Sequence, residues 1–330
     1  MRSLRPKVAL SILSVAISLA PLSATAATIT SFDVPGATVT QGISINGKGT
    51  VVGNFTDDTG FGHGFLRNAK GKITFFDPPG ARSTGPTAIN DAGQVTGGFQ
   101  DGNQAFHAFV RATDGTFTIT DPPHNGSFIS PRSINKRGVI TGFYDSGGVH
   151  GFVLKPGGKV KSFDVPGAFS LTQAMSINNK RSIAGNFDTD GGVLHAFVRD
   201  RHGKFTIFDA PGAVSTTVAG INVQGLVAGS FSTADNHGHG FIRDAQGGFT
   251  IVDVSGTVTG IRGINSAGAV TGVFLDPGSH GFVRAPNGHV DTFDPAGSIS
   301  TTPVSINRDG VVTGLYADSN GDIHGFVRSP

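Results

Sequence analysis

The chain has 330 residues, of which 50 are glycine and 17 are proline, and it contains no cysteine, no tryptophan and only two methionines. All 23 acidic residues are aspartates, and the formal net charge is +2. Without cysteine there is no disulfide, thiol nucleophile or lipidated N-terminal cysteine, and without glutamate there is no His-Glu-x-x-His zinc motif. A chain so rich in glycine and poor in good helix formers favours an all-β protein.

Residues 1–26 have the pattern of a secretory signal peptide. Arg2, Arg5 and Lys7 form a basic start, residues 8–22 are mostly apolar, and residues 24–26 read Ala-Thr-Ala, a cleavage site. The apolar stretch is shorter than the roughly 20 residues that a membrane span needs. We therefore expect a secreted or periplasmic protein that is not inserted in a membrane after cleavage.

Cleavage before Ala27 would leave 22 Lys and Arg against 23 Asp, a net charge of −1. The sequence also contains no local run of basic residues. Proteins that bind nucleic acid without sequence preference carry a clear positive excess. The charge balance therefore argues against nucleic acid as a partner.

From residue 34 onward one phrase recurs seven times: Ile-Asn-x-x-Gly-x-Val-x-Gly-x-Phe, an Asp/Gly loop, then His-(Gly/Ala)-Phe-Val-Arg, a Gly turn and Phe-Asp. The terminal aspartates recur in steps of 41 to 45 residues, a period typical of solenoids, propellers and arrays. They are Asp33, Asp77, Asp121, Asp164, Asp209, Asp253 and Asp294. The complete units are 34–77, 78–121, 122–164, 165–209, 210–253 and 254–294.

The two ends of the array favour a closed ring over an open solenoid. The seventh unit, 295–330, lacks its final Phe-Asp strand, and an orphan strand of that kind, 28–33, precedes the first unit. A solenoid would carry polar caps instead, whereas a ring can use the first strand to complete the last blade and remove an exposed edge. We predict one domain, residues 27–330: a seven-bladed β-propeller with four-stranded blades, closed by its N-terminal strand.

Turn chemistry predicts four strands in each unit. In unit 78–121 these are residues 87–90, 94–99, 107–112 and 116–121, separated by the tight turns 90–93 and 113–115 and by one longer loop. We expect the recurrent phenylalanine of the His-x-Phe triplet to form the core between blades. Tyr144 and Tyr316 occupy a second aromatic position of the repeat that should also be buried.

The triplet His-(Gly/Ala)-Phe followed by Val-Arg, with Ile-Asn-x-x-Gly-x-Val-x-Gly upstream, resembles the bacterial extracellular HAF-type repeat family. The resemblance covers the whole chain after residue 26, and residues 107–109 and 195–197 carry the triplet as His-Ala-Phe. It implies export and a repeat architecture. It implies no particular activity.

The loops between the second and third strands and between blades are the long, variable ones, and both kinds open on the same face of a propeller. This long-loop face should carry the hairpin aspartates, with the triplet histidine a few residues further on. Specific recognition needs variable loops on a rigid frame, so we predict ligand binding on this face. The candidate residues are Asp57, Asp101, Asp145, Asp188, Asp276 and Asp318, with His124 and His237 from non-repeated loop positions. A structural hydrogen bond between the hairpin aspartate and the histidine explains their recurrence more simply.

Calcium is the only metal for which the sequence offers a candidate. Asp318, Asn320 and Asp322 alternate as in a calcium loop, but no acidic residue closes the loop at its far end. Seven separate histidines do not suggest a metal site. We expect neither a cofactor nor a catalytic residue, with calcium left open.

We therefore predict an exported, non-catalytic binding or scaffolding propeller, monomeric, whose partner is an extracellular protein or a glycan. The alternative is a carbohydrate-active enzyme, a polysaccharide lyase or a glycoside hydrolase, that uses Asp and His of the long-loop face. The lack of tryptophan and the burial expected for both tyrosines count against an aromatic sugar platform.

Overall fold

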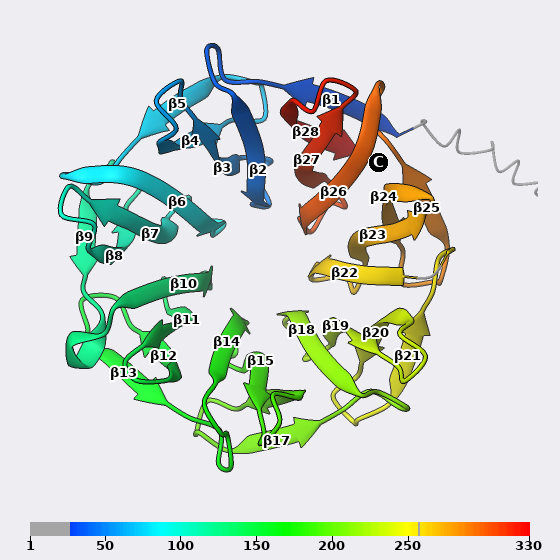
Figure 1. Cartoon of the computed structure of the whole chain (residues 1–330). Helices are drawn as coiled ribbons and strands as arrows, with labels where there is room; N and C mark the ends of the chain where they lie inside the picture. The colour runs from blue at the N-terminus through cyan, green and yellow to red at the C-terminus, as the bar shows by residue number, and fades with distance from the viewer. Residues whose placement is uncertain (1–26, 257) are drawn as a thin grey trace, which may run out of the picture.

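The computed structural model describes residues 27–256 and 258–330; the predicted signal peptide lies outside them. In this part of the chain there are 28 strands and one 3₁₀ turn, η1 (Pro123–Asn125). The strands form four-stranded sheets arranged around a common centre (Figure 1). The all-β architecture and the four-stranded units predicted from the repeat are confirmed. No helix in the described residues is long and apolar enough to cross a membrane.

Each sheet uses its strands in the same order from the centre outwards (Figure 1). The innermost strands are β2 (Val39–Ile45), β6 (Ala81–Ile89), β10 (Phe128–Ile134), β14 (Thr172–Ile177), β18 (Ser215–Ile221), β22 (Val258–Ile264) and β26 (Ser298–Ile306). The second strands are β3 (Val51–Thr56), β7 (Val95–Asp101), β11 (Ile140–Asp145), β15 (Ile183–Asp188), β19 (Val227–Ser232), β23 (Val270–Asp276) and β27 (Val312–Asp318). The third strands are β4 (Gly62–Arg67), β8 (Phe106–Arg111), β12 (Val149–Leu154), β16 (Leu194–Arg199), β20 (Gly238–Arg243), β24 (Gly278–Arg284) and β28 (Ile323–Ser329). The outermost strands are β5 (Ile73–Phe76), β9 (Phe117–Thr120), β13 (Val160–Phe163), β17 (Phe205–Phe208), β21 (Phe249–Val252), β25 (Val290–Phe293) and, for the sheet of β26–β28, β1 (Thr28–Phe32).

The N-terminal strand belongs to the same sheet as the last strands of the chain. β1 pairs antiparallel with β28, from Thr28 opposite Ser329 to Phe32 opposite Gly325. The Phe32 ring then packs edge-on against Phe65 of β4, with ring centroids 5.9 Å apart. The strand therefore joins the two ends of the chain and contacts the first sheet as well.

The predicted boundaries are least accurate for the innermost strands. In unit 78–121 the first strand begins at Ala81 and not near residue 87, because the turn at Pro78 delivers the chain directly into the strand, with Ala81 N–H donating to Pro78 O at 3.1 Å. Every innermost strand has a one-residue register shift near its C-terminal end, and β6 and β26 have a second shift near their start, at Arg82 and Ile299. The bulged residues of the shared shift line the central channel; they are Ile43, Thr87, Arg132, Met175, Ala219, Arg262 and Val304.

The triplet phenylalanine is the core residue of each sheet, as predicted. All seven copies, from Phe65 to Phe326, are at most 1% exposed. Each ring lies over the glycine of Val-x-Gly: a Cβ at Gly229, for example, would collide with Thr217 O and lie 2.9 Å from the Phe241 ring. Tyr144 and Tyr316 are buried, also as predicted.

The repeat asparagine links each sheet to the next. Its side-chain Nδ2 donates to the backbone carbonyl of the equivalent asparagine in the following sheet at 2.9–3.2 Å, and these bonds run from Asn46 round to Asn307 and from Asn307 back to Asn46. Its Oδ1 accepts backbone N–H groups of its own tight turn, as Asn178 does from Lys180 and Ser182. One residue type therefore closes the turn and ties the neighbouring sheets together.

Candidate functional site

The triplet histidine forms the same hydrogen bond in all seven sheets. Its Nδ1–H donates to the aspartate that follows the outermost strand, at 2.6–3.0 Å, including His324 to Asp33 across the two ends of the chain. The imidazole also packs on an aromatic ring of the second strand, as His107 does on Phe99 with centroids 4.9 Å apart. The triplet histidine thus fastens the second, third and outermost strands together at the long-loop end.

This geometry corrects one detail of the sequence interpretation, which paired the histidine with the hairpin aspartate. That contact is secondary and irregular: His63 Nε2 lies 3.3 Å from Asp57, while His280 Nε2 donates to the backbone oxygen of Asp276. In six of the seven sheets the main partner comes 14 residues after the histidine, because the third and outermost strands are antiparallel neighbours. The sequence pattern shows that this aspartate recurs, but it does not show that the aspartate contacts the triplet histidine.

The six candidate aspartates fall into two structural groups. Asp57, Asp101 and Asp318 each accept two backbone N–H groups of their own turn, and each has a histidine Nε2 within 3.6 Å. Asp145, Asp188 and Asp276 instead accept a serine hydroxyl from the segment before the innermost strand. Each aspartate stabilises its own loops, and whether this face binds a ligand stays a prediction.

Hydrogen bonds and neighbouring charges perturb several of these groups. The Thr59 hydroxyl, with backbone N–H groups, lowers the pKa of Asp57 to about 2. Burial of the His63 imidazole opposes its protonation, but the hydrogen bonds and charges of Asp77 and Asp57 outweigh it and raise the pKa of His63. The Asp294 carboxylate likewise raises the pKa of His280. These neighbouring carboxylates therefore favour the protonated form of both histidines.

The two candidate histidines, His124 and His237, lie in separate loops of the long-loop face. His124 is in η1 with a left-handed φ of 56°, 6.5 Å from the Tyr144 ring. His237 Nδ1–H donates to Asp235 at 2.8 Å. His237 also lines a cavity of about 250 Å³ together with the hydrogen-bonded pair His239 and Asp253.

The predicted calcium loop is a compact turn. The Asp318 carboxylate accepts the backbone N–H groups of Asn320 and Asp322 at 2.8 and 3.0 Å. Among the described residues no group of three or more His, Cys, Asp or Glu is placed to hold a metal ion. Calcium binding at Asp318, Asn320 and Asp322 stays a prediction.

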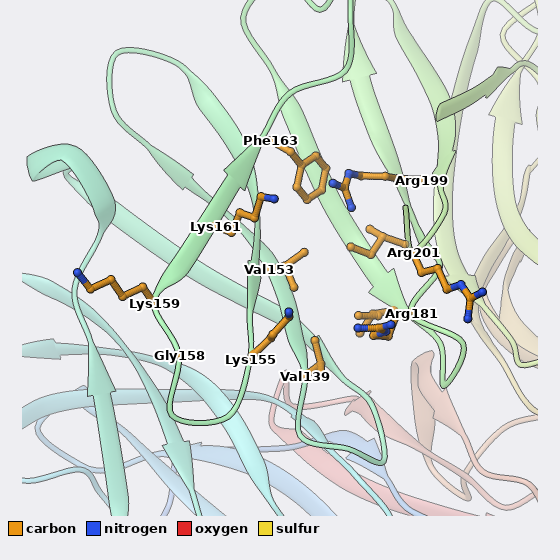
Figure 2. Close-up of a pocket in the computed structure, with 12 residues that line it drawn as sticks. Val139, Val153, Lys155, Gly158, Lys159, Lys161, Phe163, Arg181, Arg199 and Arg201 are labelled. Carbon is orange, nitrogen blue, oxygen red and sulfur yellow. The ribbon is translucent and has the colours of Figure 1, made fainter. Parts of the chain in front are cut away.

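A cavity of about 340 Å³ lies between the third sheet (β10–β13) and the fourth sheet (β14–β17) (Figure 2). Several of its lining residues differ from those at the same positions of the other units. We call it the basic cleft. Val139, Val153, Ile177, Ile183 and Phe163 give it an apolar floor, and no aspartate is among the described residues that line it. Its six cationic lining residues are Lys155, Lys159, Lys161, Arg181, Arg199 and Arg201.

These cations come from three tight-turn segments that converge at one junction. Lys155 and Lys161 flank the β12–β13 turn, Arg181 lies in the β14–β15 turn, and Arg199 ends β16. In Figure 2 Lys155 and Lys161 extend from one wall and Arg199 reaches toward Phe163 from the other, while Lys159 and Arg201 point away. Arg199 is the arginine of the repeat and stacks over the Phe163 ring, 4.7 Å from its centroid. Lys159 has equivalents in Lys72 and Lys204, and the remaining cations are particular to this pair of sheets.

Arg181 has the most unusual backbone conformation of the cleft. It occupies the fourth position of the Asn-x-x-Gly turn, where the other six units carry a glycine with positive φ, and it keeps the left-handed conformation with φ of 66°. A non-glycine residue pays about 1–2 kcal/mol for that conformation. Residues held in such conformations are concentrated at functional sites. This substitution places a half-buried guanidinium at the wall of the cleft.

Sequence reasoning missed the basic cleft because its charges are dispersed along the chain. Eleven of the 22 Lys and Arg after residue 26 fall between residues 132 and 204, against five of the 23 aspartates. No short run is basic, so a search for local clusters finds nothing. A charge count over pairs of adjacent units would have found this part of the chain.

We compared the chain with known proteins. No protein-family model and no curated protein matches it. Among solved structures it is similar to virginiamycin B lyase from Staphylococcus aureus, with 15% identity over 91% of this chain and 99% of that chain and a TM-score of 0.64. It is similar to the β-propeller domain of the Trilobed protease from Pyrococcus furiosus, with 12% identity, coverage of 88% and 94%, and a TM-score of 0.62. It is also similar to TolB from Acinetobacter baumannii, with 13% identity, coverage of 81% and 76%, and a TM-score of 0.51.

At such low identity these similarities establish the fold alone. The chain is an all-β protein of the β-propeller class. The similar structures include an enzyme, a domain of a protease and TolB. The class therefore does not select an activity, which has to be argued from the residues of this chain.

Proposed function

We propose that this protein is an exported, non-catalytic binding propeller that holds an acidic glycan in the basic cleft between its third and fourth sheets. The observation that carries the proposal is the cleft itself: six cationic residues, no lining aspartate and an arginine held in a left-handed turn. The seven His–Asp pairs support a non-catalytic function, because a residue needed in every sheet serves the fold, whereas a catalytic group is needed once.

The chemistry of the cleft suits carboxylated or sulfated sugars. Arginine and lysine donate charge-assisted hydrogen bonds to carboxylate and sulfate oxygens. The apolar floor, with the half-buried Phe163, offers a surface for the C–H face of a sugar ring. Lys155 and Lys161 are exposed and reach the ligand without a large desolvation cost.

The proposal includes the architecture and location predicted from the sequence. A seven-bladed ring closed by β1 accounts for the β1–β28 pairing and for the asparagine bond from Asn307 to Asn46. Export, through a signal peptide in residues 1–26, would place the cleft in the periplasm or outside the cell. Membership of the HAF-type repeat family, a monomeric state and the absence of a cofactor belong to the same proposal.

Binding is tested by titrating the purified protein with oligosaccharides of three kinds. Oligogalacturonate supplies carboxylates, a heparin-derived oligosaccharide supplies sulfates, and a cello-oligosaccharide serves as the neutral probe. We expect binding of at least one anionic probe, weaker at high salt because screening reduces the attraction between exposed charges. Equal binding of the neutral probe, or affinity that salt does not change, would contradict the proposal.

The site is tested with variants that restore the residues of the other repeats. Arg181→Gly returns the usual glycine, and Lys161→Thr returns the threonine found at that position in four of the other units and in β1. We expect the double variant R181G/K161T to fold and to bind about tenfold less tightly or worse, since one charge-assisted hydrogen bond contributes about 1.5–3 kcal/mol. Lys180→Gln is the matched control, because Lys180 is exposed in the same turn but does not line the cleft.

The second candidate function is the carbohydrate-active enzyme. One observation favours it: His237 lines a cavity on the long-loop face together with the pair His239 and Asp253. A lyase or hydrolase there would release shorter products from a polysaccharide, and His237→Ala would abolish that release without lowering the melting temperature. Release of products by the His237→Ala variant at the wild-type rate would remove this candidate.

A further inference from the structure

The central channel contains two arginines that face a common cavity. This cavity has a volume of about 270 Å³ and is lined by the innermost strands, with Arg132 from β10 and Arg262 from β22. These two strands lie on nearly opposite sides of the ring (Figure 1). The other innermost strands contribute no charged side chain to the lining.

Both arginines are bulged residues of their strands. The register with the second strand jumps from Pro131 to Ser133 in the third sheet and from Ile261 to Gly263 in the sixth. A bulge redirects the side chain of its unpaired residue, and here that direction is the channel. The equivalent residues are uncharged: Ile43, Thr87, Met175, Ala219 and Val304.

Neither guanidinium has a counter-charge in the part of the chain that the structure describes. No carboxylate lies within salt-bridge distance of either one, and no aspartate lines the cavity. Both side chains are open to solvent in the channel, yet the surrounding protein removes enough water to lower the pKa of Arg132. A charge held without a partner in a confined space is costly, and a bound anion would offset that cost.

The remaining polar groups of the cavity are also placed to donate hydrogen bonds. Four serine hydroxyls accept the backbone N–H of an isoleucine in the next sheet at 3.2–3.4 Å, which leaves each hydroxyl hydrogen free. These serines are Ser44, Ser133, Ser176 and Ser305, and all four line the cavity. The channel therefore combines two guanidinium groups with four hydroxyl donors.

We infer that the channel binds a small dianion with oxygen acceptors, of the size of phosphate or a short dicarboxylate. This site is separate from the basic cleft and stands independently of the proposed function, because no cationic residue is shared between the two cavities. Guanidinium groups on two sides suit a ligand whose charge is spread over oxygens on more than one side.

Calorimetric titration with inorganic phosphate and with succinate, in a buffer free of other multivalent anions, tests the inference. We expect the wild type to bind one of the two, and which of them binds identifies the source of the oxyanion. The variant R132M/R262M carries at both positions the methionine of the fourth sheet and should bind roughly tenfold less tightly or worse, because it removes both charged hydrogen-bond donors. The bound anion should raise the melting temperature of the wild type but not that of the variant.

Two comparisons keep the result interpretable. Without the anion, R132M/R262M should melt no lower than the wild type, because it removes two unpaired charges from the channel, and this shows that the variant folds. R181G/K161T should bind the small dianion as the wild type does. The inference is overturned if neither anion binds the wild type, if R132M/R262M binds as tightly as the wild type, or if only R181G/K161T loses binding.

Discussion

The left-handed arginine in the β14–β15 turn connects the stability of the protein with the proposed binding. Six units place a glycine at this point, and only the fourth places a side chain there, at φ of 66°. The left-handed conformation costs about 1–2 kcal/mol. The glycine turns of the other six units form the same structure without this cost. Arg181 is therefore best explained by the guanidinium that it places at the wall of the cleft.

Arg181→Gly should make the protein more stable. Relief of the strain, about 1 kcal/mol, corresponds to a rise in melting temperature of about 2 °C for a domain of this size. Differential scanning calorimetry of the two proteins without ligand measures this rise. A lower melting temperature for the glycine variant would show that Arg181 stabilises the fold and would remove the argument from strain.

The His–Asp pairs predict a pH dependence of stability. The Asp294 carboxylate raises the pKa of His280, so the folded state binds the imidazole proton more tightly than the unfolded state does. The resulting stabilisation is complete below the ordinary histidine pKa of about 6.5 and is lost as the pH rises through the raised value. His280→Asn should therefore lower the melting temperature more at about pH 5.5 than at about pH 9.

The control for this comparison is His289→Asn, because His289 is exposed in a tight turn. It should leave the melting temperature unchanged at both pH values. A loss in His280→Asn that is larger at the alkaline pH would mean that the neutral imidazole is the stabilising form.

At the scale of strands and turns, the asparagine ring is the element that couples neighbouring sheets. Asn178 is buried and gives its Nδ2 hydrogen bond to Asn222 O at 2.9 Å while its Oδ1 holds its own turn. Asn178→Ala should lower the free energy of unfolding by about 1–3 kcal/mol because it leaves buried groups unpaired. Asn178→Asp keeps the acceptor for the turn but sets a carboxylate oxygen against Asn222 O, so it adds a buried, repelled charge to the loss of the bond between sheets.

Urea unfolding of the three proteins gives both values. We expect Asn178→Asp to lose at least as much stability as Asn178→Ala loses, because of the buried charge. If Asn178→Ala unfolds at the wild-type urea concentration, the asparagine hydrogen bonds between sheets do not contribute to the stability of the protein.

How far the sequence predicts these elements depends on whether a feature repeats. The four strands per unit, the buried phenylalanines such as Phe65 and the pairing of the first strand with the last sheet all follow from the periodicity. The contact between His63 and Asp77 does not, because it depends on the register of β4 with β5. The channel arginines escape prediction because a bulge reverses the direction of a side chain, and the register shift that makes it cannot be read from the residues.

The basic cleft escapes prediction for another reason. Lys161 and Arg181 belong to different units, and they meet only because the β12–β13 turn lies beside the β14–β15 turn. In a repeat protein, a pattern shared by all units predicts the frame. The basic cleft is instead formed by residues of two neighbouring units that differ from the repeat, and only the packing of the units shows that these residues lie together.

For the whole molecule, the proposed closure of the ring depends on β1. Deletion of residues 27–33 removes the outermost strand of the last sheet, the Phe32–Phe65 contact and the Asp33 partner of His324. Loss of Phe32 alone should cost about 3–5 kcal/mol if its site behaves like other buried aromatic sites. We expect a much lower melting temperature for the truncated protein, with partial recovery when a peptide of residues 27–33 is added. Melting at the wild-type temperature would show that the ring closes without this strand.

The charge distribution of the whole molecule agrees with a binding site on one side of the ring. The chain beyond residue 26 is nearly neutral, yet residues 132–204 contain eleven cations against five aspartates. An anionic ligand is attracted to such a region from a distance, and the attraction falls as salt screens it. The long-loop face, with its ionised aspartates, would repel the same ligand.

A crystal structure of the protein with the anionic oligosaccharide that binds most tightly tests the central claim most directly. The account predicts density for an acidic sugar between the β12–β13 turn and the β14–β15 turn, with its carboxylate or sulfate oxygens on Arg181 and Lys161. Density on the long-loop face, near Asp57 or His237, would contradict the assignment of the site to the basic cleft.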